Sequence, residues 1–224
     1  MERFCKRGKA GDREAAAKCE VLEPALKLLE AGKPGRLLPG ALTDENVKRV
    51  LREAGLLTAK PVLYVCNVEE SNAQDGNAYS ALVAKHAAAE GAGCVIISGQ
   101  VESEVSELSP EDRMEFLKDL GLSEPGLNKL ARAAYKLLGL QTYFTAGEKE
   151  VRAWTIRVGA KAPEAAGVIH TDFERGFIRA EVFSIPDLET YKTEAGLKNA
   201  GRLRVEGKEY VVADGDIMHF RFNV

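Results

Sequence analysis

Apolar residues recur at helical intervals in the first quarter of the chain. Between Asp12 and Gly32 they fall every three or four positions, which predicts an amphipathic helix that needs a partner. This stripe consists of Ala15, Cys19, Leu22, Leu26 and Leu29. Residues 2–9 fit the end of a preceding antiparallel helix. A second amphipathic helix is expected between Thr43, its predicted cap, and Gly55, with apolar positions at Val47, Val50, Leu51 and Ala54.

After residue 60 the pattern changes to short, continuous apolar runs that alternate with helices. Residues 61–66 and 93–97 are typical of strands buried on both faces of a parallel sheet. An Ala-rich helix is expected between them at residues 77–90, and Ser109 caps a later helix that starts with proline. Pro125 begins a last helix, one face of which carries Leu127, Leu130, Ala131, Ala134, Leu137 and Leu138. This β-α-β-α order predicts an α/β unit.

From residue 141 onward, short segments with strand periodicity dominate. Residues 142–145 and 151–156, joined by a Gly-containing turn at 146–150, predict a hairpin. One short helix at residues 163–170 is expected to pack across the strands. Further strands are predicted at residues 177–183, 203–205, 210–212 and 217–222. Several strands covered by one helix form a compact α+β module.

Composition indicates an ordinary soluble globular protein of 224 residues, with 45% hydrophobic and 29% charged residues. The net charge of −3 excludes a polycation built for nucleic acid, but the charge is uneven, since residues 1–60 carry +4, residues 61–140 carry −6 and residues 141–224 carry −1. These differences predict three structural units. The sequence shows no membrane span, no secretory signal and no zinc-ligand spacing among Cys5, Cys19, Cys66 and Cys94. We therefore expect a reduced, cytoplasmic protein without a metal site.

The sharpest local feature follows the first predicted strand. Asn67 and Glu70 lie where a parallel sheet presents its strand ends, which is the usual position of ligands in α/β folds. The Asn67 amide can bond purine N7 and an exocyclic group, whereas the Glu70 carboxylate only accepts and so faces an amino or N–H donor. Ser98-Gly99-Gln100, after the second strand, can form the opposite wall. The alternatives are an ordinary turn with a solvated Glu70 and a polar loop at 98–100.

Other motifs supply no catalytic residue. The sequence contains no G-x-x-x-x-G-K-[ST] phosphate loop, no Ser-His-Asp set and no metal-ligand cluster. His170 and Asp172 fit an Asp-capped turn after a helix, and His219 fits a solvent-facing strand position. Arginines mixed with aromatic residues fit either an RNA-facing surface or the solvent-exposed face of a half-buried sheet. They are Arg175, Arg179, Arg202 and Arg204, with Phe173, Phe177 and Tyr210.

Several segments resemble the YchF / Obg-like ATPase family, which belongs to the Obg branch of the P-loop GTPases. Residues 60–70 (KPVLYVCNVEE) resemble its base-recognition segment. Residues 143–156 (YFTAGEKEVRAWTI) resemble the start of its C-terminal TGS domain. The similarity continues in residues 165–181 (AAGVIHTDFERGFIRAE) and 214–224 (DGDIMHFRFNV), and it is weakest in residues 1–57.

The resemblance implies an α/β plus α+β chain of three parts. Residues 1–57 correspond to the end of a helical coiled-coil arm, residues 58–140 to the second half of a Rossmann-like P-loop G domain with a partial parallel sheet, and residues 141–224 to a ubiquitin-like β-grasp TGS domain. For the full-length family it implies ATP or GTP with magnesium as cofactors, and the ribosome or ribosomal RNA as a partner. The base contacts fall to Asn67, Val68, Glu70, Ser98 and Gly99. Glu70 stands where ordinary GTPases carry Asp, which is compatible with the adenine amino group.

The family's phosphate loop, switch segments and magnesium ligands precede the arm, and this sequence contains none of them. We therefore expect a truncated member: a fragment, a split gene product or a late internal start at Met1, with the first half of the G domain as a missing partner. As the C-terminal portion of a redox-independent, ribosome-associated nucleoside triphosphatase, it retains base recognition but is not expected to hydrolyse nucleotide alone, or to bind it tightly. The alternative is a non-enzymatic ribosome- or RNA-binding module built from the arm and the TGS domain.

Overall fold

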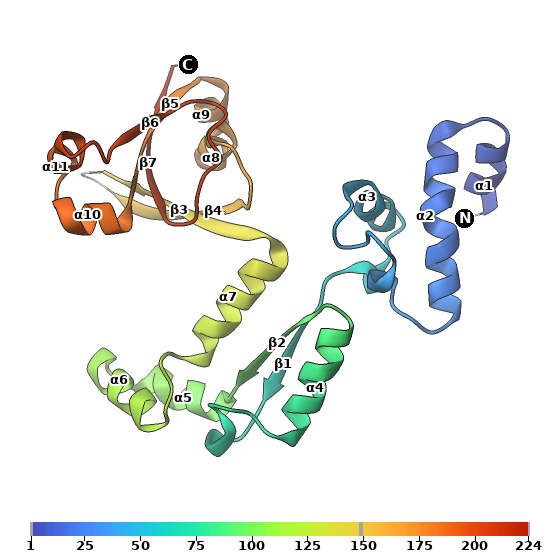
Figure 1. Cartoon of the computed structure of the whole chain (residues 1–224), viewed down its shortest axis with the longest axis horizontal. Coiled ribbons are helices and arrows are strands. Elements are labelled where there is room, and N and C mark those ends of the chain that lie inside the picture. Colours follow the sequence, from blue (N-terminus) through green and yellow to red (C-terminus); the bar gives the residue numbers. More distant parts are fainter. Residues whose placement is uncertain (1, 148–149, 224) are drawn as a thin grey trace. The chain divides into compact units, whose positions relative to one another are not determined.

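The structure, a computed structural model, describes residues 2–147 and 150–223 (Figure 1). The chain forms two compact units, one ending at Ala133 and one spanning Ala134–Val224. The first contains α1 (Glu2–Lys9), α2 (Arg13–Glu30), η1 (Gly35–Leu37), α3 (Glu45–Glu53), η2 (Leu57–Ala59), β1 (Leu63–Asn67), η3 (Glu70–Asn72), α4 (Ala78–Ala89), β2 (Gly93–Ile97), α5 (Gly99–Glu107), α6 (Pro110–Asp119) and the start of α7 (Gly126–Leu138). The second contains β3 (Leu140–Ala146), β4 (Val151–Arg157), α8 (Ala162–Ile169), α9 (Thr171–Arg175), β5 (Phe177–Ser184), α10 (Ile185–Tyr191), α11 (Glu194–Asn199), β6 (Arg204–Glu206) and β7 (Asp216–Phe222).

The helices α1 and α2 form a tight hairpin. Gly11 has a φ of 99°, a conformation that glycine adopts without steric cost. Asp12 Oδ1 accepts the backbone N–H of Ala15 at 3.0 Å and so caps α2. A Cβ atom on Gly8 would lie 2.7 Å from the Ala16 Cα atom, so glycine is what allows the two helices to approach this closely.

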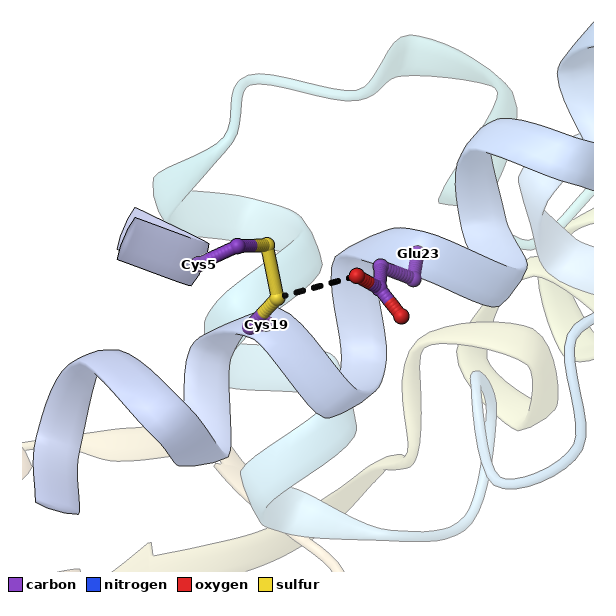
Figure 2. Close-up of side chains that lie close together, drawn as sticks. All are labelled: Cys5, Cys19 and Glu23. Carbon is purple, nitrogen blue, oxygen red and sulfur yellow. Dashed lines mark hydrogen bonds between the residues drawn. A yellow bond between two sulfur atoms is a disulfide. The ribbon is translucent and has the colours of Figure 1, made fainter. Parts of the chain in front are cut away.

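The expectation of four reduced cysteines is wrong in this structure. Cys5 of α1 and Cys19 of α2 form a disulfide, with Glu23 nearby on α2 (Figure 2). The close approach of the helices at Gly8 brings the two cysteine Cα atoms to 5.2 Å, within the range that a disulfide requires. Spacing along the sequence does not show this pairing, because it depends on how α1 packs against α2.

The helices α2 and α3 share an apolar core that includes only part of the predicted stripe of α2: Leu22 packs against this core and Ala15 is buried, but Leu26 is not. The buried members of this core are Val21, Ala25, Leu38, Ala41, Val50 and Leu51. Leu51 is 1% exposed, whereas Leu26 of the predicted stripe is 37% exposed. Leu26 instead lines an open groove of about 350 Å³ between α2 and α3. The predicted stripe of α3 is confirmed at Val50 and Leu51.

The start of α3 also differs from the prediction by one residue. Asp44, rather than Thr43, is its cap, since Asp44 Oδ1 accepts the N–H groups of Asn46 at 2.8 Å and Val47 at 2.9 Å. A carboxylate at this position also suits the positive end of the helix.

The strands β1 and β2 form a two-stranded parallel sheet. β2 spans the predicted residues, whereas β1 begins two residues later than predicted and extends to Asn67. α4 follows β1 and starts at the cap Asn77. No residue of either strand is fully buried, so the expectation of strands covered on both faces is wrong for the described part of the chain. The reason is that β1 and β2 have only each other as strand neighbours there.

One ion pair ties the segment after α2 to the end of α4. The Arg36 guanidinium lies 2.6 Å from Glu90 Oε2, and both side chains are largely buried. The Tyr64 hydroxyl of β1 donates to the same carboxylate oxygen at 3.1 Å. Three separate parts of the first unit therefore meet at Glu90.

The helix α6 begins where the sequence predicts, and α7 begins one residue later than predicted, at Gly126. Ser109 caps α6, accepting the N–H of Asp112 at 3.2 Å. At the start of α7, the N–H groups of Gly126 and Leu127 donate to the Glu102 carboxylate at 2.6 Å and 3.1 Å. The predicted apolar face of α7 is not covered along its length, since Leu127 is 55% exposed.

The second unit is a five-stranded mixed sheet in the order β4-β3-β7-β5-β6. β3 and β7 run parallel, and the other neighbours are antiparallel. α8 packs on this sheet, where Ala162, Ala165 and Ala166 are fully buried. The buried Tyr143 hydroxyl of β3 donates to the carbonyl of Ala165 at 2.8 Å. Burial raises the pKa of Tyr143 well above its ordinary value, so the hydroxyl keeps the proton that it donates.

Three short helices and one strand depart from the prediction in this unit. α9, α10 and α11 were not expected. The predicted strand at residues 210–212 forms only an isolated bridge, Val211 with Lys161, because the chain leaves the sheet on either side of it. The predicted hairpin of β3 and β4 is confirmed, but Glu148 and Lys149 of its turn lie outside the described residues.

Candidate functional site

The carboxyl ends of β1 and β2 bring Asn67, Ser98 and Gly99 together. Asn67 is the last residue of β1, and its Oδ1 accepts the N–H of Gly99, the first residue of α5, at 2.9 Å. Just beyond β1, the N–H of Val68 donates to the carbonyl of Ile97 at 2.9 Å. These two bonds join the strand ends into one continuous edge.

Ser98 caps α5 and is 2% exposed. Its Oγ atom accepts the N–H of Val101 at 3.5 Å. The polar loop considered for residues 98–100 is therefore wrong, since α5 begins at Gly99. The signal for this helix was present in the sequence, because Val101 and Val105 stand one helical turn apart and both are buried.

Val68 and Glu70 lie just past the end of β1, in different environments. Val68 is 9% exposed and contributes backbone groups to the edge. Glu70 is half-buried and begins η3, where its carbonyl accepts the N–H of Ala73 at 2.9 Å. The Glu70 carboxylate has no hydrogen bond or ion pair within the described residues, and no contact joins it to Asn67. The turn considered as an alternative is present, and the carboxylate remains available to a ligand.

The edge combines donors and acceptors in a pattern that suits a flat, nitrogen-rich ring. The Asn67 amide retains its two Nδ2 hydrogens and the second lone pair of Oδ1 after bonding Gly99. The Glu70 carboxylate only accepts. A ring that presents both a ring-nitrogen acceptor and an amino donor can use both side chains.

The histidines His170 and His219 each have a local structural role, and they do not come together in one site. His170 is itself the cap of α9, since its Nδ1 accepts the N–H of Asp172 at 3.2 Å, so the expected cap at Asp172 is wrong by two residues. The expectation that His219 faces solvent is also wrong. Its side chain is 22% exposed and lies edge-on to Phe183, and its Nε2 atom is buried without a partner among the described residues. The unpredicted α11 explains the difference, because it brings Glu194 within 3.5 Å of His219 Nδ1.

The aromatic residues of the predicted RNA-facing surface are engaged within the second unit. Phe173 stacks on Phe222 with ring centroids 3.8 Å apart, and Phe177 is 4% exposed. The Tyr210 hydroxyl donates to Asp216 at 2.7 Å, and the Arg204 guanidinium lies over the Tyr210 ring. These rings are therefore not free to stack on bases, and any role of the surface rests on its arginines.

Cys5, Cys19 and Glu23 form the one group of three metal-ligating side chains that lie close together within residues 2–147 and 150–223. Figure 2 shows Glu23 Oε1 directed at Cys19, 3.5 Å from its sulfur. Thiolates are the metal-binding form of cysteine, and the disulfide removes both of them. The group therefore offers no metal site in this state.

None of the helices in the described part of the chain combines the length and apolar character needed to cross a bilayer.

Comparison with known proteins identifies relatives along the whole chain. Residues 140–223 match a family model described as "YchF-GTPase_C: Protein of unknown function (DUF933)". The chain is 50% identical over 224 residues to the ribosome-binding ATPase YchF of Pasteurella multocida, and 49% identical over 226 residues to that of Bacillus subtilis. In each case the alignment covers 100% of this chain and 61% of the relative. The chain thus spans about three fifths of the length of these curated relatives.

Solved structures also include proteins that are similar to this chain. The structure of the Schizosaccharomyces pombe YchF GTPase superposes with a TM-score of 0.78 and 37% identity, covering 95% of this chain and 55% of that one. A GTP-binding protein from Pyrococcus horikoshii shares the fold, with a TM-score of 0.52 at 14% identity. The chain is thus similar along its whole length to proteins named YchF, and its residues 140–223 match the model of that family's C-terminal domain.

Proposed function

We propose that residues 58–140 are the second half of a G domain and read the purine base of ATP or GTP with Asn67, Val68, Glu70, Ser98 and Gly99. The observation that carries this proposal is the bond from the Gly99 N–H to Asn67 Oδ1, since it unites two strand ends into one recognition edge. Ligands bind at such strand ends in α/β sheets. Relatives named as ATPase and GTPase support a purine nucleotide as the ligand.

Each group has a role in this proposal. Asn67 Nδ2 donates to purine N7, and its remaining Oδ1 lone pair accepts from an exocyclic amino group. The Glu70 carboxylate accepts from the adenine amino group, with the Val68 carbonyl beside it. Ser98 holds the start of α5 so that Gly99 lies against the base. Because the sequence contains no phosphate loop, nothing in it cradles the phosphates or magnesium, so we expect weak nucleotide binding and no hydrolysis by this chain alone.

The other two parts fit the same proposal. Residues 1–57, with α2 packed on α3, form the end of a helical arm. Residues 141–224, with α8 across a mixed five-stranded sheet, form a β-grasp TGS domain. The ribosome is the proposed partner and the cytoplasm the proposed location, on the strength of relatives named as ribosome-binding.

Saturation-transfer NMR with ATP tests the base-reading proposal. We expect transfer to the adenine protons, weakened several-fold by Glu70→Gln because the acceptor charge is lost. Glu69→Gln is the matched control, since Glu69 is the neighbouring, exposed carboxylate and should leave the transfer unchanged. Equal signals from both variants would contradict the proposal. In calorimetry, micromolar affinity for ATP would contradict the expectation of weak binding.

A second function, ribosome or RNA binding without catalysis, is favoured by the net charge of +4 in residues 1–60. We expect the chain to pellet with ribosomes at low salt and to be released as salt rises, because contacts to phosphates depend on counterion release. Absence of association at low salt would remove the support for this function.

A further inference from the structure

Two free thiols face each other on the first sheet. Cys66 of β1 and Cys94 of β2 have Sγ atoms 3.7 Å apart, and both side chains are half-buried. In the strand register Cys94 lies opposite Tyr64, and Cys66 lies two residues further along β1. Side chains two residues apart point to the same face of a strand. That face carries α4, since the Tyr64 ring packs edge-on against His86 of α4.

This offset is unfavourable for a disulfide. Strands about 4.8 Å apart, with a rise of about 3.3 Å per residue, place two such Cα atoms roughly 8 Å from each other. A disulfide bridges Cα atoms up to about 7 Å apart, so closing one here requires the backbone to move. The sulfur atoms nevertheless lie close to each other, at 3.7 Å.

The separation suits a single atom bound between the sulfurs. Two metal–thiolate bonds of about 2.3 Å at a tetrahedral angle place the sulfur atoms about 3.8 Å apart. Trivalent arsenic is pyramidal and binds thiolates at smaller S–As–S angles, so from the observed 3.7 Å the two sulfurs need only a small approach by side-chain rotation. No third His, Cys, Asp or Glu completes a cluster with this pair within the described residues. Sulfur ligands without oxygen or nitrogen partners select soft centres over hard ones.

We propose that Cys66 and Cys94 form a dithiol site for a soft, thiophilic centre, represented by trivalent arsenic, with the two sulfurs as its only protein ligands. With an aryl arsine oxide, two As–S bonds form, and the arsenic oxygen leaves as water with the two thiol protons. Neither sulfur nor arsenic changes oxidation state. Burial beneath α4 and the contact with Cys66 raise the pKa of the Cys94 thiol, so at neutral pH this proton is present to leave with the oxygen.

Native mass spectrometry with phenylarsine oxide tests the site, in a Cys5→Ala/Cys19→Ala background that removes the other cysteine pair. We expect one arsenical per chain, retained in excess monothiol and released by a dithiol. Adding Cys66→Ala or Cys94→Ala should weaken binding by about 100-fold or more, since only one As–S bond remains. Absence of an adduct in the background variant, or its retention after Cys66→Ala, would overturn the proposal.

Measuring arsenical binding in urea distinguishes a site built by the fold from the general reactivity of two thiols. In the unfolded chain the two cysteines are separated by a long loop, so we expect binding to the background variant to weaken on unfolding. Equal affinity of folded and unfolded chains would show that the fold does not build the site. Circular dichroism of each variant establishes that it is folded before binding is compared. None of these outcomes depends on whether the chain binds nucleotide.

Discussion

The two units differ in how far their sheets are covered. In the second unit, Tyr143, Val182 and Met218 lie on neighbouring strands and are each 0% exposed. In the first unit, no residue of β1 or β2 is fully buried, although the strand sequences are more continuously apolar. An apolar run in the sequence therefore predicts a strand, but it does not predict which elements pack on the faces of that strand. The second unit closes a core of its own, whereas in the first unit α4 packs on one face of a two-stranded sheet in which no residue is fully buried.

The largest expected effect contrasts a buried residue of the second sheet with an exposed residue of the first. Met218→Ala should destabilise the second unit by about 2–5 kcal/mol, because it opens a cavity among fully buried neighbours. Val65→Ala, at a position 43% exposed on β1, should change stability by about 0.5 kcal/mol or less. Urea unfolding followed by backbone-amide NMR, which resolves residues of each unit separately, measures both. A cost at Val65 equal to that at Met218 would contradict the comparison.

A smaller effect is expected where the second unit satisfies a buried polar group. Tyr143→Phe should cost about 1–3 kcal/mol, because the buried carbonyl of Ala165 loses its donor. The matched control is Tyr79→Phe, since Tyr79 is 79% exposed and its hydroxyl is free to bond water. Urea unfolding of both variants should show a loss at Tyr143 alone, and similar curves would indicate that the hydrogen bond contributes little.

The smallest expected effect is a pH dependence in the first unit. Hydrogen bonds from Arg36 and then Tyr64 lower the pKa of Glu90 from its ordinary value of 4.5. A carboxylate with a lowered pKa stabilises the fold above the unfolded-state value, and this contribution is lost as the pH falls through the folded-state value. The advantage of the wild type over Glu90→Gln in thermal melts should therefore shrink as the pH falls below 4.5. An advantage that is constant with pH would exclude this ion pair as its source.

Local sequence patterns predict those elements whose signals are local. Ser109 followed by proline marks the start of α6, and the apolar run at 93–97 marks β2. The helices α10 and α11 were missed because helices of seven and six residues are unstable without tertiary packing, which local patterns do not contain. The Cys5–Cys19 bond was missed for a related reason, since it depends on the approach of α1 to α2 at Gly8.

The candidate site also combines features that local sequence patterns predict with features that depend on tertiary packing. That Asn67 and Ser98 lie close together follows from parallel strand ends, and this was predictable. The direction of the Asn67 amide is not predictable in this way, because it is set by the Gly99 N–H at the start of a helix that the local sequence does not distinguish from a polar loop. For Glu70, the sequence predicts an acceptor after β1, and the structure adds that its carboxylate is unengaged within the described residues.

The proposed reading of a purine base by the edge formed by β1 and β2 is tested most directly by an NMR titration with adenosine. Backbone amide shifts followed through both units locate the bound base. We predict the largest changes at Gly99 and Val68, strongly reduced in Asn67→Ala, and none at Thr142 or elsewhere in β3. Changes confined to the second unit, or changes at Gly99 that persist in Asn67→Ala, would contradict the account.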